Sequence, residues 1–591
     1  MAPEPKGKLD AVMVAANGPE DVTPHWDAVD WRACEESVRR LRQRIFTASR
    51  AGDLKRVRNL QKLMLRSRAN ALLGVRRVTE RNAGRKTGID GEVVLSSKAK
   101  MDLACRVQLG EPSRARPLKR VHIPKRGGGK QRPLGIPVIA DRVQQARVAS
   151  ALEPEWEARF EPRSYGFRPG RGCHDAIAVI YVTSNGKSPR RQWALDADLA
   201  AAFDRIDHTH ILCQLGSFPA RELVRQWLKA GVIDPTEEGT PQGGVISPLL
   251  LNIALHGMEK AAGVLYETGA RAGFTVKGSP VLVRYADDLI VLCHTRQQAV
   301  EVKARLAAWL TLRGLAFNEE KTRIVTLDEG FDFLGFNVRR YRGKLLIRPS
   351  KTAIRRVRER LRTEMRSLRG TNAEAVLIRL NPIIRGWSAY YRGVVSSARF
   401  NSLDDYVWKL TYKWATYSHP NKPKRWIVKR YFGMFNRARR DKWVFGDRAS
   451  GVYLSKFAWM RIVRHQLVTG ASSPDDPALT EYWAERRRKT PHPAIGKARL
   501  RPYRTQDGRC PLCGDWLLPA DDPPPTPHQW EQWLASTRKT IKIVKHTDGT
   551  SDNKPRLVHT SCHRRHKIPP RQPPSASAHP PAPGACLSRM R

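Results

Sequence analysis

Acidic side chains, cysteines and long apolar runs are all scarce in this chain of 591 residues. Asp and Glu number 56 against 106 Lys and Arg, so the formal net charge is +50 and a polyanionic partner is expected. Nine cysteines are too few and too scattered for a disulfide-stapled secreted fold, and they favour a reducing compartment. The longest uncharged run, 239–258, is broken by prolines and glycines, so no membrane span is expected.

The residues that are present indicate a folded nucleic-acid-binding protein. A hydrophobic fraction of 41% is enough to build several cores, which excludes global disorder. Basic residues recur along the whole chain instead of flanking one apolar helix, which favours nucleic acid over a membrane surface as the polyanion. Residues 1–18 contain no continuous apolar core, so we expect no secretion signal and a cytoplasmic location.

Composition divides the chain into seven stretches of different character. They are a loose N-terminus (1–30), a basic helical region (31–110), a mixed α+β region (111–345), a helical region rich in arginine and aromatic residues (346–470), a linker region (471–504), a small Cys/His unit (505–568) and a Pro-rich tail predicted to be disordered (569–591). Within them, residues 31–78 predict a pair of basic helices, and 471–476 and 521–527 are typical of linkers. Apolar positions stepping by three or four predict a helix over 354–370.

The region after residue 380 combines tryptophans with clustered lysines and arginines. Seven of the 16 tryptophans lie between positions 387 and 483. Aromatic rings beside cations suit an RNA-binding surface, on which unpaired bases stack. Such rings are as readily the ordinary core of a helical domain, and the sequence leaves both interpretations open.

Two acidic segments could carry chemistry. In the strand-like segment 193–199, alternation places Leu195 and Ala197 on one face and Asp196 and Asp198 on the other. Residues 281–292 predict a β-hairpin with Asp287 and Asp288 at its turn. If the hairpin lies beside the first strand, three carboxylates converge. They would then suit two Mg²⁺ ions, which prefer oxygen ligands.

The order of motifs resembles that of reverse transcriptases, specifically the bacterial group II intron-encoded reverse transcriptase/maturase family, over roughly residues 41–567. The motifs are 123–125 (IPK) with 132–137 (RPLGIP), 164–170 (SYGFRPG), the Asp strand with 203–204 (FD), 239–248 (GTPQGGVISP), 285–288 (YADD), 315–322 and 333–336 (FLGF). The resemblance implies an α+β fold of the right-hand polymerase type, with fingers and a palm built on an antiparallel sheet, a helical thumb and maturase domain, and RNA-directed DNA polymerase activity.

The resemblance also implies roles for single residues. Asp198, Asp287 and Asp288 would form the magnesium-binding triad, with Asp287 the hairpin ligand used most directly and Asp196 secondary. Phe203 would lie under the sugar of the incoming nucleotide and favour deoxynucleoside triphosphates. The remaining nucleotide contacts would be the finger-tip cations Lys125 and Arg132, with Gln242 near the nucleotide and Lys321 as a further phosphate contact.

The segment 385–392 looks like the maturase domain of the same family, which implies binding to structured intron RNA during splicing. The other partners implied are an RNA template, a DNA primer and target DNA, and no membrane. The host compartment would be a bacterial cytoplasm, close to RNA and the nucleoid.

The C-terminal unit predicts a zinc site. Cys510 and Cys513 form one pair, and His559 and Cys562 form a second pair with the same two-residue spacer, a tetrahedral zinc set that would staple a small unit. The unit also resembles HNH endonucleases of the ββα type. That resemblance implies His546 as the general base and His563, with His566, as ligands of a divalent nuclease ion.

The match to the nuclease is incomplete, so alternatives stay open. Lys545 stands where a second adjacent histidine is usual, and Lys554 where an asparagine is usual. A zinc-stapled DNA-binding module without nuclease activity is therefore an alternative. For the whole protein the alternatives are a splicing-only RNA-binding maturase and a related reverse transcriptase of another retroelement or defence system.

Overall fold

The computed structural model describes residues 25–81, 87–109, 114–124, 131–186, 191–230, 239–240, 243–269, 273–436, 438–489, 497–518, 524–544 and 555–567. Lys125, Gln242 and His546 lie outside these ranges, as does the predicted Pro-rich tail. For Arg132 and His566 the backbone is described but not the side chain. No helix within the described ranges is both long enough and apolar enough to cross a bilayer.

The N-terminal region folds into more helices than the predicted pair. Three helices, α1 (Trp31–Arg50), α2 (Leu54–Arg66) and α3 (Arg68–Arg76), follow the short η1 (Trp26–Ala28), and η2 (Arg77–Arg81) and α4 (Ser97–Leu109) come after them. The prediction of a pair is wrong because Asp53 and Ser67 each cap a new N-terminus with their side chains. The hairpin of β1 (Lys119–Pro124) and β2 (Gln131–Ile136) and the buried helix α5 (Ile139–Glu157) come next.

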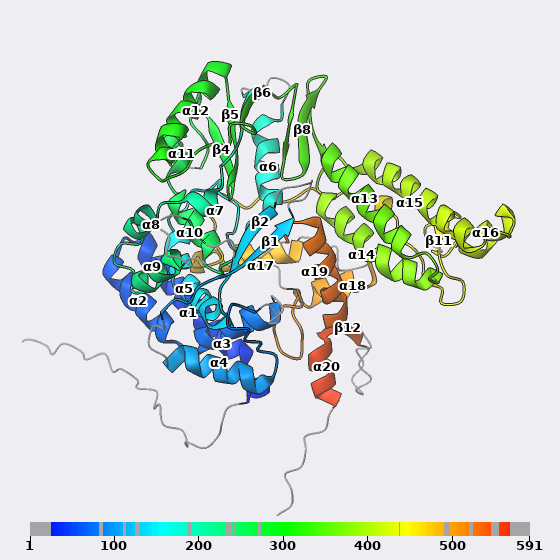
Figure 1. The fold of residues 1–591 in the computed structure, drawn as a ribbon, viewed down its shortest axis with the longest axis horizontal. Coiled ribbons are helices and arrows are strands. Elements are labelled where there is room, and N and C mark those ends of the chain that lie inside the picture. Colours follow the sequence, from blue (N-terminus) through cyan, green and yellow to red (C-terminus); the bar gives the residue numbers. More distant parts are fainter. Residues whose placement is uncertain are drawn as a thin grey trace, which may run out of the picture.

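A four-stranded antiparallel sheet, which we call the Asp sheet, lies near the top of the view in Figure 1, beside α12. Its strand order is β4 (Val281–Tyr285), β5 (Asp288–Cys293), β3 (Trp193–Asp198) and β6 (Arg323–Thr326). Alternate residues of these strands enter two different cores, because both faces are covered. Helix α6 (Cys173–Ser184) packs on β4, and α12 (Arg296–Thr311) packs on β3, β5 and β6. Between β3 and β4 in the sequence come α7 (Ala202–Arg205), α8 (His208–Leu215), α9 (Arg221–Lys229), α10 (Ser247–Ala254) and α11 (Met258–Ala261).

A second antiparallel sheet leads into a helical region. Its strands are β7 (Phe331–Phe333), β8 (Phe336–Tyr341) and β9 (Lys344–Pro349). The helical region holds α13 (Lys351–Ser367), α14 (Ala373–Tyr391), α15 (Ser397–Ser418), α16 (Lys424–Tyr431), the short strands β10 (Phe432–Gly433) and β11 (Val444–Phe445), and η4 (Phe457–Trp459). The helix predicted over 354–370 is confirmed as α13, which begins earlier because Ser350 caps it.

The aromatic residues of this region divide between core and surface. Trp387 and Trp414 are only 5% and 3% exposed and pack in the helical core, whereas Trp443 is 53% exposed. The interpretation as ordinary core is therefore confirmed for the buried rings, and the interpretation as an RNA-binding surface stays a prediction for the exposed ones. One exposed ring, that of Tyr417, has the guanidinium of Arg369 above it, 4.6 Å from the ring centroid.

Residues 471–476 are a buried anchor, so their interpretation as a linker is wrong. Asp475 and Asp476 are each 6% exposed. They form ion pairs of 2.7 Å with Arg42 and Arg50 of α1. The acidic residues that resembled a solvated linker are thus the counter-charges of the basic N-terminal helices.

The C-terminal unit lies against the helical region. It follows η5 (Pro477–Leu479), α17 (Thr480–Lys489) and α18 (Lys497–Thr505), and it contains α19 (Pro527–Thr540), β12 (Ile541–Val544), β13 (Arg556–His559) and α20 (Thr560–Lys567). Figure 1 shows α19 alongside α14. The contact is close, because a Cβ on Gly386 would lie 2.7 Å from the backbone nitrogen of Glu531. The second predicted linker, 521–527, is described only from residue 524 onward. Its last two residues, Thr526 and Pro527, form the N-cap and the first residue of α19.

Candidate active site

The Asp sheet brings together the two segments that carry the predicted catalytic carboxylates. Strands β3 and β5 pair antiparallel, with Asp198 directly opposite Asp288. Asp287 occupies the β4–β5 turn, which is made possible by Ala286 in the left-handed conformation (φ +59°). Asp198, Asp287 and Asp288 therefore meet at one end of the sheet, although about ninety residues of sequence separate the strand from the hairpin.

The three carboxylates create a site that favours a cation. Burial raises the pKa of Asp288 to about 7, and the charges of Asp287 and Asp198 add to the effect. Lys321 supplies one counter-charge, since its ammonium group contacts the Asp198 carboxylate. That hydrogen bond raises the pKa of Lys321. The three clustered carboxylates supply the oxygen donors that a divalent cation prefers.

Asp196 lies on the same face of β3 as Asp198 but has a different partner. Its carboxylate pairs with Arg323 of β6 at 3.2 Å, and burial raises its pKa. Both aspartates border an open cavity of about 400 Å³. The turn at Leu334 closes the cavity on the side of β7. The cavity is roomy enough for a polymer end beside the carboxylates.

Phe203 is placed beside the carboxylates by a short strained connection. After β3 the chain turns through Ala201, which is left-handed with φ +48°, into the one-turn helix α7. Phe203 is half-buried on that helix, and its carbonyl accepts a hydrogen bond from Thr240 N. This bond ties α7 to the described edge of the 239–248 motif. Gly243 of the same motif approaches Gly135 O of β2 so closely that a Cβ there would lie 2.7 Å away.

Sequence reasoning missed the residues that support the hairpin from behind. Arg284 is fully buried and donates from Nη1 to Asn252 Oδ1 (2.9 Å) and to the Ala286 carbonyl (3.4 Å). Asn252 in turn donates to Gly166 O at 2.8 Å. Burial lowers the pKa of Arg284 to about 10. A charged residue inside the apolar run 281–285 was the signal available, because a buried arginine needs polar partners.

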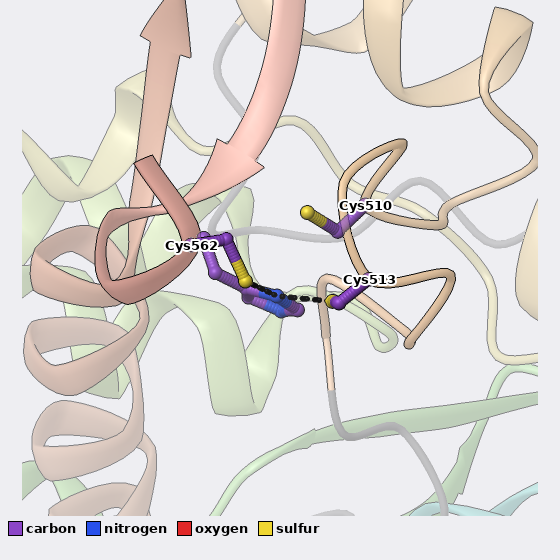
Figure 2. Close-up of side chains that lie close together, drawn as sticks. Cys510, Cys513 and Cys562 are labelled. Atoms are coloured by element: carbon purple, nitrogen blue, oxygen red, sulfur yellow. Dashed lines mark hydrogen bonds between the residues drawn. The ribbon is translucent and has the colours of Figure 1, made fainter. Parts of the chain in front are cut away.

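A second candidate site lies in the C-terminal unit. The ligand atoms of Cys510, Cys513, His559 and Cys562 all lie within 4.8 Å of one another. Figure 2 shows the three cysteine side chains turned toward a common point. His559 Nδ1 lies 3.3 Å from Cys513 Sγ, while Nε2 faces the Trp516 carbonyl at 3.2 Å. A carbonyl on the outer nitrogen is the usual support of a metal-binding histidine, so these residues fit a tetrahedral metal site.

The predicted nuclease residues are only partly described. Strands β12 and β13 pair antiparallel and lead into α20, which is the backbone order of a ββα unit. His563 lies on α20 but does not belong to the group of four ligands. His546 falls between the two strands in the sequence, outside the described residues.

Comparison with known protein families yields three matches. Residues 26–107 match the N-terminal domain of reverse transcriptase. Residues 123–338 match the reverse transcriptase (RNA-dependent DNA polymerase) model, a range that includes the Asp sheet and the Asp198–Asp288 pair. Residues 354–432 match the group II intron maturase-specific domain. The reverse transcriptase match implies the use of divalent metal ions.

Three curated relatives illustrate how much of the chain is shared. The chain is 34% identical over 264 residues to protein YkfC of Escherichia coli, covering 39% of this chain and 68% of that protein. It is 38% identical over 153 residues to the group II intron-encoded protein LtrA of Lactococcus lactis, covering 24% of this chain and 25% of LtrA. A 91 kDa protein in the cob intron of Schizosaccharomyces pombe is 27% identical over 48% of this chain and 44% of its own length.

Among solved structures, the telomerase of Candida albicans in complex with a fragment of telomeric RNA aligns over 52% of this chain and 59% of its own. The TM-score is 0.26 and the identity 14%. A likeness this weak carries no conclusion about the fold.

Proposed function

The chain belongs to the group II intron-encoded reverse transcriptase and maturase family, and from this premise we propose that it copies intron RNA into DNA at a target primer and assists splicing of the same intron. It carries an RNA-directed DNA polymerase domain followed by a maturase-specific domain. The target-primed mode of copying and the roles of single residues below are parts of the proposal.

The polymerase proposal depends on one observation above all, the opposition of Asp198 and Asp288 beside the turn that holds Asp287. Their oxygens are the donor type that Mg²⁺ prefers, and burial together with the charges of the two neighbouring aspartates raises the pKa of Asp288. Two magnesium ions bound here would activate the primer 3′-hydroxyl and stabilise the leaving pyrophosphate. The three aspartates would fix the position of this chemistry at the end of the Asp sheet.

The other residues of the site would hold the nucleotide and the primer. Phe203 would face the sugar and exclude a 2′-hydroxyl, which favours deoxynucleoside triphosphates. Lys125 and Arg132 would hold the triphosphate, with Gln242 near the nucleotide. Lys321 would exchange its contact with Asp198 for a phosphate oxygen of the substrate.

The maturase proposal is supported by the exposed surface of the helical region. The side chain of Trp443 is 53% exposed and that of Tyr417 is 57% exposed with Arg369 above it, while Lys422 lies 5.6 Å from the ring of Trp426. Rings that have cations beside them bind unpaired bases without strong sequence preference. By binding one conformation of the intron RNA, this surface would stabilise the state that splices, and catalysis of splicing would belong to the RNA.

For the C-terminal unit we propose a structural zinc ion on Cys510, Cys513, His559 and Cys562, with target DNA as the partner of the unit. We propose the domain limits expected from the sequence as well, including the fingers and palm (111–345) and the HNH-like unit (505–568). We also propose that His546 and His563, with a further divalent ion, nick DNA. The eight described cysteines form no disulfide, which fits action in a bacterial cytoplasm.

Two other functions were open from the sequence. A splicing-only maturase would have no use for a complete set of Asp198, Asp287, Asp288 and Phe203 grouped at one end of a sheet. A reverse transcriptase of a defence system would have no use for a maturase-specific domain, which this chain carries. Both observations favour the intron-encoded protein.

The test is reconstitution of the full chain with the RNA that flanks its gene, with cDNA synthesis and splicing assayed in parallel. We expect Asp287→Ala to abolish cDNA synthesis and to leave the splicing rate within about threefold, because binding one RNA conformation needs no metal triad. The surface variant Asp328→Ala serves as control. Loss of both activities in Asp287→Ala would contradict the separation of roles.

A further inference from the structure

Phe167 has a backbone conformation that a phenylalanine rarely adopts. Its φ is +60°, in the left-handed region that favours glycine. Phe167 is also 47% exposed, although the neighbouring Gly166 lies against Ala286 in the turn that holds Asp287. A non-glycine residue in this region is strained and persists only where its neighbours impose the conformation, which is most common at functional sites.

The neighbours on both sides fix this conformation. On one side, Gly166 lies against the hairpin turn, where a Cβ would collide with the backbone nitrogen of Ala286. On the other side, the Arg168 guanidinium forms two 2.9 Å hydrogen bonds with the Glu157 carboxylate, and both side chains are 1% exposed. The chain is therefore held rigidly before and after Phe167, and the strained residue itself is the part that faces outward.

The ring of Phe167 packs against two other aromatic rings, those of Phe203 and Tyr285. Its centroid lies 6.4 Å from that of Phe203 at an interplanar angle of 74°, an edge-to-face arrangement. It lies 6.5 Å from the ring of Tyr285, the residue that begins the Tyr-Ala-Asp-Asp turn. Phe203 is carried by a helix of only four residues, so its ring depends on contacts like these for a fixed orientation.

We infer that Phe167 is a positioning residue for sugar selection, which holds the Phe203 ring where it excludes a ribose 2′-hydroxyl. This inference rests on the proposed role of Phe203 and extends it to a residue from a different motif. To exclude a single oxygen atom, the ring that contacts the sugar must keep its orientation, because a small rotation of the ring would make room for the 2′-hydroxyl. Contact with Phe167 would limit rotation of the Phe203 ring. Phe167 can do this without being buried, because residues 166 and 168 on either side of it are held in place.

The experiment measures kcat/KM for a deoxynucleotide and for the matching ribonucleotide in primer extension by the full chain. The variants are Phe203→Val, Phe167→Leu, Phe167→Gly, the double variant Phe203→Val/Phe167→Leu, and the control Phe274→Leu, whose ring is 65% exposed away from the site. We expect Phe203→Val to lower the preference for deoxynucleotides most strongly. Phe167→Leu and Phe167→Gly should each lower it by about tenfold, chiefly by raising kcat/KM for the ribonucleotide.

Two further readouts separate positioning from general stability. Phe167→Gly removes the backbone strain, so the thermal midpoint should stay within about 3 °C of the wild type while selectivity falls. In the double variant, Phe167→Leu should add little to the effect of Phe203→Val, because it acts through that ring. Phe167→Tyr, which keeps the ring, should keep the wild-type preference.

The outcomes distinguish this inference from the proposal beneath it. If Phe203→Val changes selectivity but Phe167→Leu and Phe167→Gly do not, the role of Phe167 is overturned and the gate stands. Full additivity in the double variant would also overturn it. If Phe203→Val leaves selectivity unchanged, the gate itself fails, and the role of Phe167 fails with it.

Discussion

At the scale of single residues, buried charged side chains support the β4–β5 hairpin that carries Asp287 and Asp288. Arg284 holds the carbonyl of Ala286 in place through a guanidinium that has no exposure to solvent. Glu161 and Glu259 lie close to it in the same interior region, and burial raises the pKa of Glu259 to about 7, with the charge of Glu161 as the next cause. The catalytic end of the Asp sheet therefore depends on charges that lie behind it.

The raised pKa of Glu259 predicts a loss of stability as pH rises. A glutamate in an unfolded chain titrates near 4.3, so between that pH and about 7 the folded state binds the proton more tightly than the unfolded state does. The stabilisation is complete below the unfolded pKa and is lost as pH rises through about 7.

We expect the thermal midpoint of the wild type to decrease when the pH is raised from 5.5 to 8. The decrease should be smaller in Glu259→Gln. Differential scanning calorimetry at both pH values measures it, with the exposed Glu301→Gln as control. An identical pH dependence in wild type and Glu259→Gln would show that this group does not carry the effect.

Residue identity and alternation predicted the acidic site well but not its supports. Strand alternation placed Asp196 and Asp198 on one face, and the hairpin pattern placed Asp287 at a turn, because both depend on local periodicity. Alternation alone did not choose between Asp196 and Asp198, and the family resemblance favoured Asp198. In the structure Arg323 pairs with Asp196, whereas Asp288 lies opposite Asp198. Phe167 could not be recognised from sequence, since its distinguishing feature is a dihedral angle imposed by distant contacts.

At the scale of elements, the packing of α19 on α14 was not predictable. The sequence predicted a separate unit over residues 505–568, because a short segment with a Cys/His pattern is typical of a small independent domain. In the structure, Trp530 and Leu534 of α19 enter the same core as Trp387 and Leu380 of α14. Arg360 of α13 also pairs with Glu531 at 2.8 Å.

Gly386 tests this helix contact. Its missing side chain allows the backbone of α19 to approach, so Gly386→Val should force the two helices apart and weaken the docking by about 1–3 kcal/mol. Hydrogen exchange in α19 should become faster, while exchange in the Asp sheet should not change. Gly393→Val provides the control, because the nearest atom to a Cβ there is 3.8 Å away. Equal protection of α19 in both variants would mean that this contact does not hold the helix.

At the scale of the whole molecule, segments distant in sequence hold the chain together. The 471–476 anchor joins the helical region to α1 through Arg42 and Arg50. Arg32 of α1 also donates to the Cys513 carbonyl at 3.1 Å, which links the N-terminal helices to the Cys/His group. Such contacts between ends of a sequence escape any argument from local pattern, which is why residues 471–476 resembled a linker.

The Cys/His group predicts a specific response to metal removal. The purified protein should contain about one zinc ion per chain by atomic emission, and Cys513→Ser should lose most of it, while Cys213→Ser, an exposed cysteine elsewhere, should keep it. A zinc-selective chelator should expose the C-terminal unit to protease without reducing primer extension. Zinc content unaffected by Cys513→Ser would contradict the assignment of the ligands.

The most direct test of the polymerase site compares two aspartates that share one strand and one face. RNA-templated primer extension in Mg²⁺ should fall by at least about a thousandfold in Asp198→Asn, because a ligand of the catalytic ions is lost. Asp196→Asn should retain activity within about tenfold, since that carboxylate is paired with Arg323. Substantial activity in Asp198→Asn, or an equal loss in Asp196→Asn, would contradict the account.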